Sequence, residues 1–351
     1  MSRPQPRPRA FVRLAGAAIV AAVLSASPAC ADVVSVAAMM RGVSITAEQC
    51  SALPQAVWIS THGKSFCVRY YLSTAGGDGR RPVVMLQGDQ LGRFDSRSRR
   101  FEPAPDAKLA DTNTDDLMKF ADRISQITKA PAIYLARIGL DGSGGHHGIR
   151  HSFLELYATN AALETIKLRH RFEGYDLIGQ SGGATLVGGL LALRNDIACA
   201  VPGSGRLALL NMPRNPDPLA AAFDPSRMAP TIARNRNARI LVVTDPQDEV
   251  VPAQHQSGFV SALRQAGGTA EQFFVEATDP KRHGVSIYAT YAAAACLRGN
   301  STEEVGQELA ALVEKRVAAA RAKAERESRP QSALPEGVVA PRGAFSPGTA
   351  S

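Results

Sequence analysis

The sequence contains little of what metal and nucleotide sites require. Its five cysteines include no Cys-x-x-Cys pair and no Cys/His spacing typical of zinc. There is no Gly-x-x-x-x-Gly-Lys-[Ser/Thr] loop for a nucleotide phosphate. The sequence also has no internal repeat and contains only one tryptophan. We therefore expect neither a cofactor nor a bound metal ion.

The body of the chain also has no net charge, although the formal net charge of the whole chain is +8. Residues 1–31 hold four arginines and no acid, and residues 315–351 hold seven basic and three acidic side chains. Residues 32–314 are therefore neutral, which gives no electrostatic reason to expect nucleic acid as a partner. We interpret the basic C-terminal tail as solvated rather than as a contact for anionic lipid.

Long apolar runs are absent outside the N-terminus. There, residues 14–24 are apolar and follow the arginines, and Ala29-Cys30-Ala31 is a small-x-small cleavage site. This pattern predicts a signal peptide over 1–31 and a periplasmic or secreted protein with no stable membrane insertion after cleavage. An uncleaved anchor and a lipoprotein at Cys30 are the alternatives, but the run is shorter than the roughly 20 apolar residues of a membrane helix.

Export would leave four cysteines in an oxidising compartment, and an even number there predicts two disulfides. Cys50 and Cys67 are close in sequence, which favours their pairing; Cys199 would then pair with Cys296 by elimination. Four cysteines allow three pairings, and buried free thiols are the alternative.

Short apolar runs alternate with helical patterns along most of the chain. A hairpin is predicted over 57–73, and buried strands are predicted at 82–86, 132–138, 175–178, 197–201, 239–243 and 271–276. The predicted helices are 114–129, 152–170, 184–194, 226–235, 253–266 and 284–297. This alternation predicts an α/β fold, with a mostly parallel central sheet, helices on both faces and an N-terminal antiparallel hairpin.

The predicted organisation is one catalytic domain over 32–300, with a polar surface loop at 89–111. Ser301 and Glu304 form a capping box that begins a C-terminal helix at 301–327. Residues 328–351 are rich in Pro, Gly, Ala and Ser and are predicted to be a disordered tail.

Gly179-Gln180-Ser181-Gly182-Gly183 fits the pattern Gly-x-Ser-x-Gly. It follows an apolar strand and begins a helix, the context in which a strained strand-turn-helix elbow exposes a serine hydroxyl. Glycines are needed on both sides because a side chain would clash with backbone at so tight a turn. We interpret Ser181 as a nucleophile, with a plain glycine-rich turn as the alternative.

A serine hydroxyl needs a base to take its proton, and the base needs an acid to orient it. His283 follows the last predicted strand and is the candidate base. Asp248 follows the penultimate strand in Asp-Glu-Val-Val-Pro and is the candidate acid; Asp245, at the strand terminus, is interpreted as a turn cap.

With these three motifs, residues 57–298 resemble the α/β-hydrolase superfamily, most closely its prolyl-oligopeptidase-like and dienelactone-hydrolase-like branches. The resemblance implies an α/β-hydrolase fold with a Ser-Asp-His triad. It also implies an oxyanion hole with two backbone N–H donors, of which Gly182 is one. The second comes from a loop where Gln87 replaces the usual histidine; Asp89 is the predicted donor, through its N–H, and Gln90 the alternative.

The loop from 142 to 151 contains His146, His147 and His151. Adjacent histidines lack the helical spacing of a metal site and no carboxylate triad is nearby, so we interpret the loop as surface or as the rim of the active site. Arg137 and Arg150 are candidates for binding a substrate carboxylate, with salt bridges as the preferred interpretation.

Together these residues predict an exported serine hydrolase that cleaves a carboxylic ester, or a similar acyl bond, through an acyl-serine intermediate. One alternative is a prolyl-oligopeptidase-like serine peptidase, against which the lack of an obvious propeller over 32–80 counts. The other is a non-catalytic envelope binding protein. The substrate would be a small-molecule or peptide acyl compound.

Overall fold

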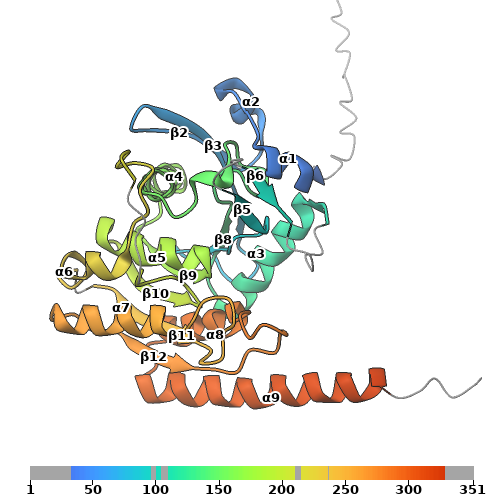
Figure 1. Cartoon of the computed structure of the whole chain (residues 1–351), viewed down its shortest axis with the longest axis vertical. Helices are drawn as coiled ribbons and strands as arrows, with labels where there is room; N and C mark the ends of the chain where they lie inside the picture. Colours follow the sequence, from blue (N-terminus) through green and yellow to red (C-terminus); the bar gives the residue numbers. More distant parts are fainter. Residues whose placement is uncertain (1–32, 96–99, 104–109, 210–214, 236, 329–351) are drawn as a thin grey trace, which may run out of the picture.

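The computed structural model describes residues 33–95, 100–103, 110–209, 215–235 and 237–328. The predicted signal peptide and nearly all of the predicted tail lie outside these residues. The centre is an eight-stranded sheet with the order β12-β11-β10-β9-β4-β8-β3-β2 (Figure 1). Its strands are β2 (Ala56–Thr61), β3 (Lys64–Ser73), β4 (Val83–Leu86), β8 (Ala132–Leu135), β9 (Tyr175–Gln180), β10 (Ile197–Gly203), β11 (Arg239–Thr244) and β12 (Glu271–Phe274).

Strands β2 and β3 form an antiparallel hairpin, and β3 also pairs antiparallel with β8. All pairs from β8 to β12 are parallel, so the carboxyl ends of β4, β9, β11 and β12 lie at one edge of the sheet. The predicted mostly parallel sheet with an N-terminal hairpin is confirmed.

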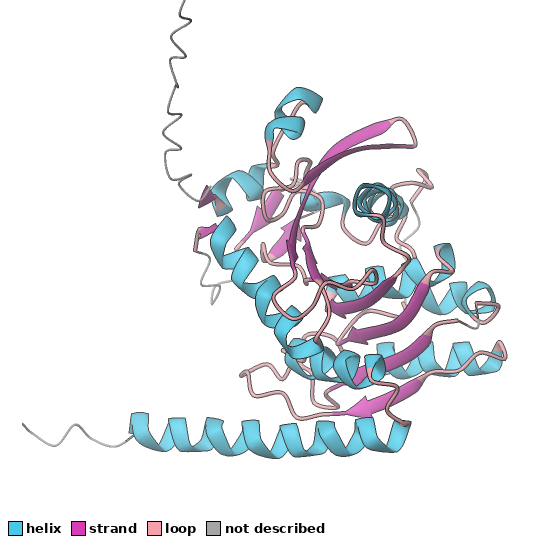
Figure 2. Ribbon diagram, turned by 180° about the vertical axis from the view of Figure 1, so that it is seen from behind, coloured by secondary structure: helices cyan, strands magenta, loops and turns pink. Residues whose placement is uncertain are grey.

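Helices cover both faces of the sheet (Figure 2). One face packs on α4 (Phe153–His170), α5 (Gly182–Leu193), α6 (Ala229–Ile232) and α7 (Gln254–Gln265). The other packs on α1 (Val36–Arg41), α3 (Thr114–Thr128), α8 (Ser286–Leu297) and α9 (Thr302–Ser328). Helix α9 buries only Val305 and Leu309, and it continues past the sheet edge with its later residues exposed (Figure 1).

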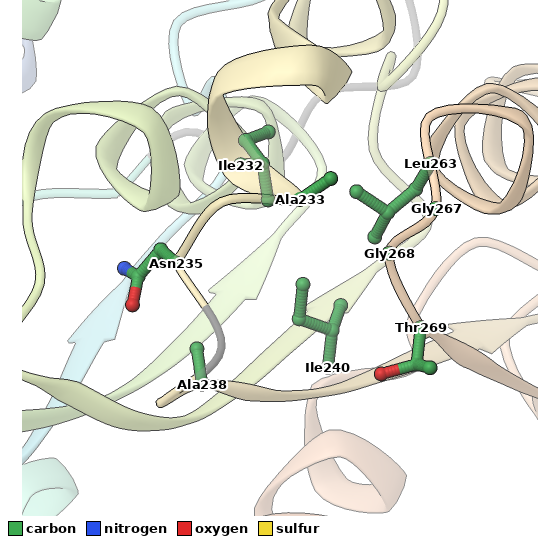
Figure 3. A pocket seen from close by; sticks show the side chains of 9 residues that line it. All are labelled: Ile232, Ala233, Asn235, Ala238, Ile240, Leu263, Gly267, Gly268 and Thr269. Carbon is green, nitrogen blue, oxygen red and sulfur yellow. The ribbon is translucent and has the colours of Figure 1, made fainter.

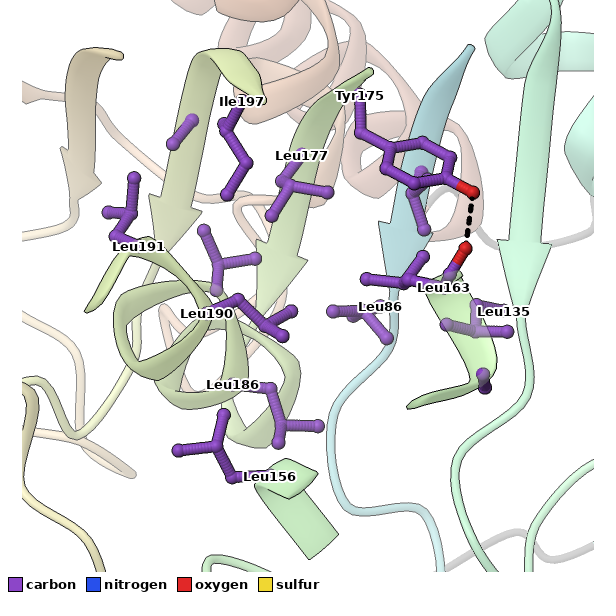
Figure 4. Close-up of a cluster of buried hydrophobic side chains, with 14 of the residues drawn as sticks. Leu86, Leu135, Leu156, Leu163, Tyr175, Leu177, Leu186, Leu190, Leu191 and Ile197 are labelled. Carbon is purple, nitrogen blue, oxygen red and sulfur yellow. Dashed lines mark hydrogen bonds between the residues drawn. The ribbon is translucent and has the colours of Figure 1, made fainter. Parts of the chain in front are cut away.

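Alternation of side chains along the buried strands builds the two core layers. In β4, Val84 and Leu86 point to the layer under α4 and α5, whereas Val83 and Met85 point to the other. Tyr175 is fully buried in the first layer, where its hydroxyl donates to the carbonyl of Leu163 at 2.8 Å (Figure 4). The buried phenol therefore costs no unsatisfied polar group.

The predicted loop 89–111 is not entirely irregular, which corrects the sequence interpretation. A short antiparallel pair forms there from β5 (Arg93–Asp95) and β6 (Arg100–Glu102). Likewise, β1 (Val33–Val34) pairs with β7 (Thr112–Asn113), and α2 (Ala47–Ala52) was not predicted. These elements span two to six residues, too few for a hydrophobic period to emerge.

The structure contains both predicted disulfides, Cys50–Cys67 and Cys199–Cys296. The first ties α2 to the hairpin strand β3, and the second ties β10 to α8. Within the described ranges, no helix combines the length and apolar character that crossing a bilayer requires.

The buried carboxyl of Asp176 gives a testable prediction about how the stability of the protein depends on pH. It lies in β9 and accepts a hydrogen bond from the Cys199 N–H at 2.8 Å, and burial raises the pKa of its carboxyl from 3.8 to about 6 although Arg81 opposes this. Between pH 3.8 and about pH 6, the folded state binds more protons than the unfolded state, so the free energy of unfolding falls as pH rises.

Asp176→Asn should therefore raise the free energy of unfolding by about 3 kcal/mol at pH 8 and by much less at pH 4. Urea denaturation at both pH values measures the difference. A benefit of equal size at the two pH values would contradict the assigned ionisation.

Candidate active site

Ser181 occupies the sharp turn between β9 and α5. Its backbone has φ 54° and ψ −119°, outside the regions that residues with a side chain normally adopt. The Ser181 N–H donates to the carbonyl of Gly203 at 2.9 Å, and the serine side chain makes no capping bond to α5. The strained turn thus leaves the hydroxyl unused by the helix that follows.

Close backbone packing explains two glycines of the motif. A Cβ at Gly179 would lie 2.5 Å from the Cα of Ala184, and one at Gly183 would lie 2.0 Å from the carbonyl oxygen of Leu86. Both obstacles are backbone atoms, which cannot turn away as a side chain can. Strand β4 and the elbow therefore touch directly, and the loop after β4 is brought beside Ser181.

The imidazole of His283 is bound to Asp248. Its Nδ1 lies 2.8 Å from Oδ2 and 3.0 Å from Oδ1, so Nδ1–H donates to the carboxylate and Nε2 carries the free lone pair. Burial would raise the pKa of Asp248, but hydrogen bonds from His283 and the backbone N–H of Val251 lower it. Asp248 is therefore ionised at neutral pH and fixes the histidine tautomer.

Asp245 holds the backbone of the histidine loop rather than the imidazole. It is fully buried at the end of β11 and accepts from the N–H groups of Ala277 and Gln247 at 2.7 and 2.8 Å. It also accepts from Arg282 Nε at 2.8 Å, next to the histidine. Asp245 therefore positions the histidine loop, whereas Asp248 contacts the imidazole ring of His283.

Gln180, directly before the serine, links the elbow to the same loop. Its Nε2 donates to the carbonyl of His283 at 2.8 Å, and its Oε1 accepts from the N–H of Val285 at 3.1 Å. One buried amide therefore sets the distance between the serine turn and the histidine turn. Sequence reasoning treated Gln180 as a variable position of the motif, since only the fold reveals both partners.

Most of the predicted site residues line one pocket of about 370 Å³. Its walls contain Ser181, Gly182, His283 and Asp89, while Asp248 lies behind His283. Within the described part of the chain, no hydrogen bond joins the Ser181 hydroxyl to the imidazole; such contacts are commonly long before substrate binds. The remaining lining residues are Gly92, Arg150, His151, Arg206, Val250 and Val251.

The two predicted oxyanion donors, Gly182 and Asp89, both line the pocket of Ser181. Gly182 begins α5, so its N–H has no carbonyl four residues back within the helix. Gly88 approaches so closely that a Cβ there would lie 2.9 Å from the Cβ of Ser181, which brings Asp89 to the pocket wall. Gln90, the alternative donor, does not line this pocket and its amide points to Tyr134 and Asp141.

The carboxylate of Asp89 is the centre of a cationic cluster that sequence reasoning did not predict. Arg137 Nη1 lies 2.7 Å from Oδ1, and Arg150 Nε lies 3.2 Å from Oδ2. His147 Nε2 and His151 Nε2 approach the same two oxygens at 3.2 and 2.9 Å. The two arginines thus form salt bridges, as preferred from the sequence, and Arg150 and His151 at the end of the histidine loop line the pocket.

Behind Asp89, Arg137 forms a second ion pair with Glu155 on α4. The distance from Nε to Oε1 is 2.9 Å, and both side chains are almost fully buried. Burial would raise the pKa of Asp89, but the charges of His151 and Arg137 and the imidazole hydrogen bonds hold it well below its usual range. Asp89 is therefore a carboxylate whose charge is compensated before any ligand enters.

His147 is buried, whereas the sequence suggested a surface or rim position for the whole loop. Its Nδ1 lies 3.1 Å from the carbonyl of Ile138, and burial together with Arg137 lowers its pKa. His146 caps the adjacent 3-10 turn by accepting the Gly148 N–H. Across the described ranges, no group of three or more His, Cys, Asp or Glu side chains is arranged to hold a metal ion.

A smaller pocket of about 170 Å³ lies between α6, α7 and β11 (Figure 3). Its walls include Ile232, Ile240 and Leu263, and none of the described lining residues is charged or a histidine.

The serine turn after β9, the acid after β11 and the histidine after β12 follow in the chain order Ser, Asp, His on one parallel sheet. The chain has an α/β-hydrolase fold. No family model matches the sequence, and no curated protein matches it. The more specific branches suggested by the sequence motifs stay predictions.

Solved structures similar to this chain include an esterase of Pyrococcus furiosus, at 14% identity and TM-score 0.49, covering 73% of this chain and 94% of that one. An esterase from Butyrivibrio proteoclasticus with ferulic acid bound has 14% identity and TM-score 0.47, covering 70% and 99%. An acylaminoacyl peptidase of Pyrococcus horikoshii has 12% identity and TM-score 0.44, covering 67% of this chain and 38% of the peptidase.

The buried ion pair between Arg137 and Glu155 is testable by its effect on stability. Glu155→Gln should lower the free energy of unfolding by about 3–5 kcal/mol, because Arg137 keeps its buried charge and loses a charged partner. Glu164→Gln on the same helix removes a half-exposed partner of Arg194 and should cost less than about 1 kcal/mol. Chemical denaturation measures both; equal small losses would show that the buried pair is not a strong constraint.

Proposed function

We propose that the chain is an exported serine hydrolase that cleaves a carboxylic ester through an acyl-serine intermediate. The observation that carries the proposal is the Asp248-bound imidazole of His283, which lines the same pocket as the strained Ser181. An orienting carboxylate, a histidine with a free Nε2 and an exposed serine hydroxyl are the groups that acyl transfer requires.

In this mechanism the Ser181 oxygen attacks the ester carbonyl while His283 Nε2 takes the hydroxyl proton. Asp248 stays ionised and stabilises the imidazolium that forms. The tetrahedral intermediate collapses, the imidazolium gives its proton to the leaving alkoxide, and an acyl-serine remains. A water molecule then attacks the acyl carbon, giving its proton to His283, and the carboxylic acid leaves as Ser181 regains its proton.

The oxyanion of each tetrahedral intermediate would be bound by the N–H groups of Gly182 and Asp89. Both residues line the pocket, and no described residue accepts a hydrogen bond from either N–H. Loss of one such donor typically raises the barrier by about 2.7–4 kcal/mol. The Asp89 carboxylate does not oppose this role, because Arg137 and Arg150 pair with it.

Export is supported by the two disulfides, since such bonds persist in oxidising compartments. The N-terminal sequence pattern adds a basic segment, an apolar run and a cleavage site. We therefore place the mature protein in the periplasm or outside the cell.

A fluorophosphonate probe tests the nucleophile directly. The unsubstituted chain should be labelled at Ser181, and Ser181→Ala should not be. Ser204→Ala is the matched control. Ser204 lies in the loop beside the elbow, and its buried hydroxyl has no hydrogen-bond partner among the described residues. Asp248→Asn should keep the fold and reduce kcat for p-nitrophenyl esters by about 10⁴-fold, since the imidazole loses its orienting charge.

Two outcomes would overturn the proposal. Folded protein that the probe does not label at Ser181 would favour the binding-protein alternative. Faster cleavage of aminoacyl anilides than of p-nitrophenyl esters, abolished by Ser181→Ala, would replace the esterase proposal with a peptidase.

Gln180 offers a separate prediction about positioning. Gln180→Leu removes both bonds to the histidine loop and should lower kcat by roughly 10–100-fold with little change in KM, because the base is misplaced relative to Ser181. Gln272→Leu is the control: this amide binds Thr244 and Ser257 instead. Faster hydrogen exchange of the Val285 N–H should accompany the loss of kcat only in the Gln180 variant.

A further inference from the structure

Among the described residues that line the pocket of Ser181, Arg206 is the arginine that no carboxylate neutralises. Its side chain is exposed and lines the pocket beside Ser181, and it makes no ion pair with any described residue. Arg150, the other lining arginine, is bound to Asp89. A guanidinium that lines the pocket of the proposed nucleophile and makes no ion pair with a described residue is available to a ligand.

The backbone under Arg206 is fixed against the elbow. Gly205 lies so close that a Cβ there would meet the side chain of Ala184 at 2.6 Å and the carbonyl of Ser181 at 3.2 Å. Gln256 Nε2 donates to the Gly205 carbonyl at 2.6 Å, and Leu207 is fully buried. The backbone of Arg206 is thus held between buried neighbours, beside the serine turn.

The charges around the pocket leave a positive excess at this position. Asp89 is the only carboxylate among the described lining residues, and Arg137, Arg150 and His151 already surround it. Asp248, behind the wall, is bound to His283. An anionic group entering near Arg206 therefore meets no uncompensated acid in the described lining.

The rest of the lining limits the size and character of the substrate. Val250 and Val251 add apolar surface to the lining, and the volume of about 370 Å³ suits a small molecule. An ester with a short apolar spacer and a terminal anion would satisfy both kinds of wall at once.

We infer that the substrate of the hydrolase proposed above is an ester that also carries a free carboxylate at its other end, and that Arg206 binds this carboxylate. The inference deepens the proposed function and rests on it. Arg206 is assigned a specificity role: it contacts the remote end of the substrate and takes no part in proton transfer. Guanidinium and carboxylate can share two parallel hydrogen bonds, a geometry that a lysine ammonium cannot reproduce.

The test compares two p-nitrophenyl esters of the same chain length, the pentanoate and the hemiglutarate. The unsubstituted chain should prefer the anionic ester in kcat/KM. In Arg206→Gln the ratio of anionic to neutral kcat/KM should fall by about 10–100-fold, mainly through KM, as expected for loss of a charge-assisted pair. Arg206→Lys should recover only part of the ratio, and added NaCl should reduce the preference.

Arg234→Gln is the matched control, because Arg234 is also exposed, donates to the Thr231 hydroxyl and is not among the residues that line this pocket. Its ratio should stay within about twofold of the unsubstituted value. Equal kcat/KM for the two esters in the unsubstituted chain would overturn the inference, as would an equal loss on both esters in Arg206→Gln. The proposed function would survive either result.

A binding experiment separates this inference from the proposed function. In Ser181→Ala protein, calorimetry should detect monomethyl glutarate but not dimethyl glutarate, and Arg206→Gln in that background should abolish the difference. Equal binding of the two compounds would refute the carboxylate site even if no ester is ever hydrolysed. Tighter binding of methyl phosphate than of monomethyl glutarate would overturn the choice of carboxylate and assign phosphate instead.

Discussion

The strained turn at Ser181 is the constraint on which the rest of the site depends. A serine at φ 54° persists only when its surroundings hold it there. Here the backbone of β4 presses on Gly183, the Ser181 N–H is bound to Gly203, and the Gln180 amide reaches the histidine loop. Core packing on both faces of the sheet therefore maintains a turn that its local sequence would not adopt alone.

The same sheet edge explains how residues a hundred positions apart meet. Because β9, β11 and β12 are parallel, the turns after them open on one side, and each contributes one group. Asp245 and Arg282 then hold the last of these turns, so that Asp248 needs to orient only the ring of His283. The disulfide between β10 and α8 ties the sheet to the helix that follows the histidine.

The sequence predicted the sheet, the elbow and the acid and base candidates because each leaves a local pattern. Buried strands are short apolar runs, and Gly-x-Ser-x-Gly at a strand end indicates a turn. The cluster around Asp89 leaves no such pattern. Its members come from the β4 loop, the end of β8 and the histidine loop, and only the fold makes Arg137 and Arg150 neighbours of one carboxylate. The six-residue helix α2 was missed for the different reason that it is too short to show a period.

The cluster also explains why a carboxylate is tolerated beside a site proposed to stabilise negative charge. Asp89 and Glu155 contribute two negative charges, and Arg137 and Arg150 contribute two positive ones, so the cluster cancels without counting its histidines. The positive charge of Arg206 is not part of this balance, so it remains available to an anionic ligand in the pocket. The burial of Arg137 and Glu155 makes the cancellation permanent, because neither partner can turn to solvent. In the proposed mechanism, the cations that neutralise Asp89 would therefore differ from the cation that selects the substrate.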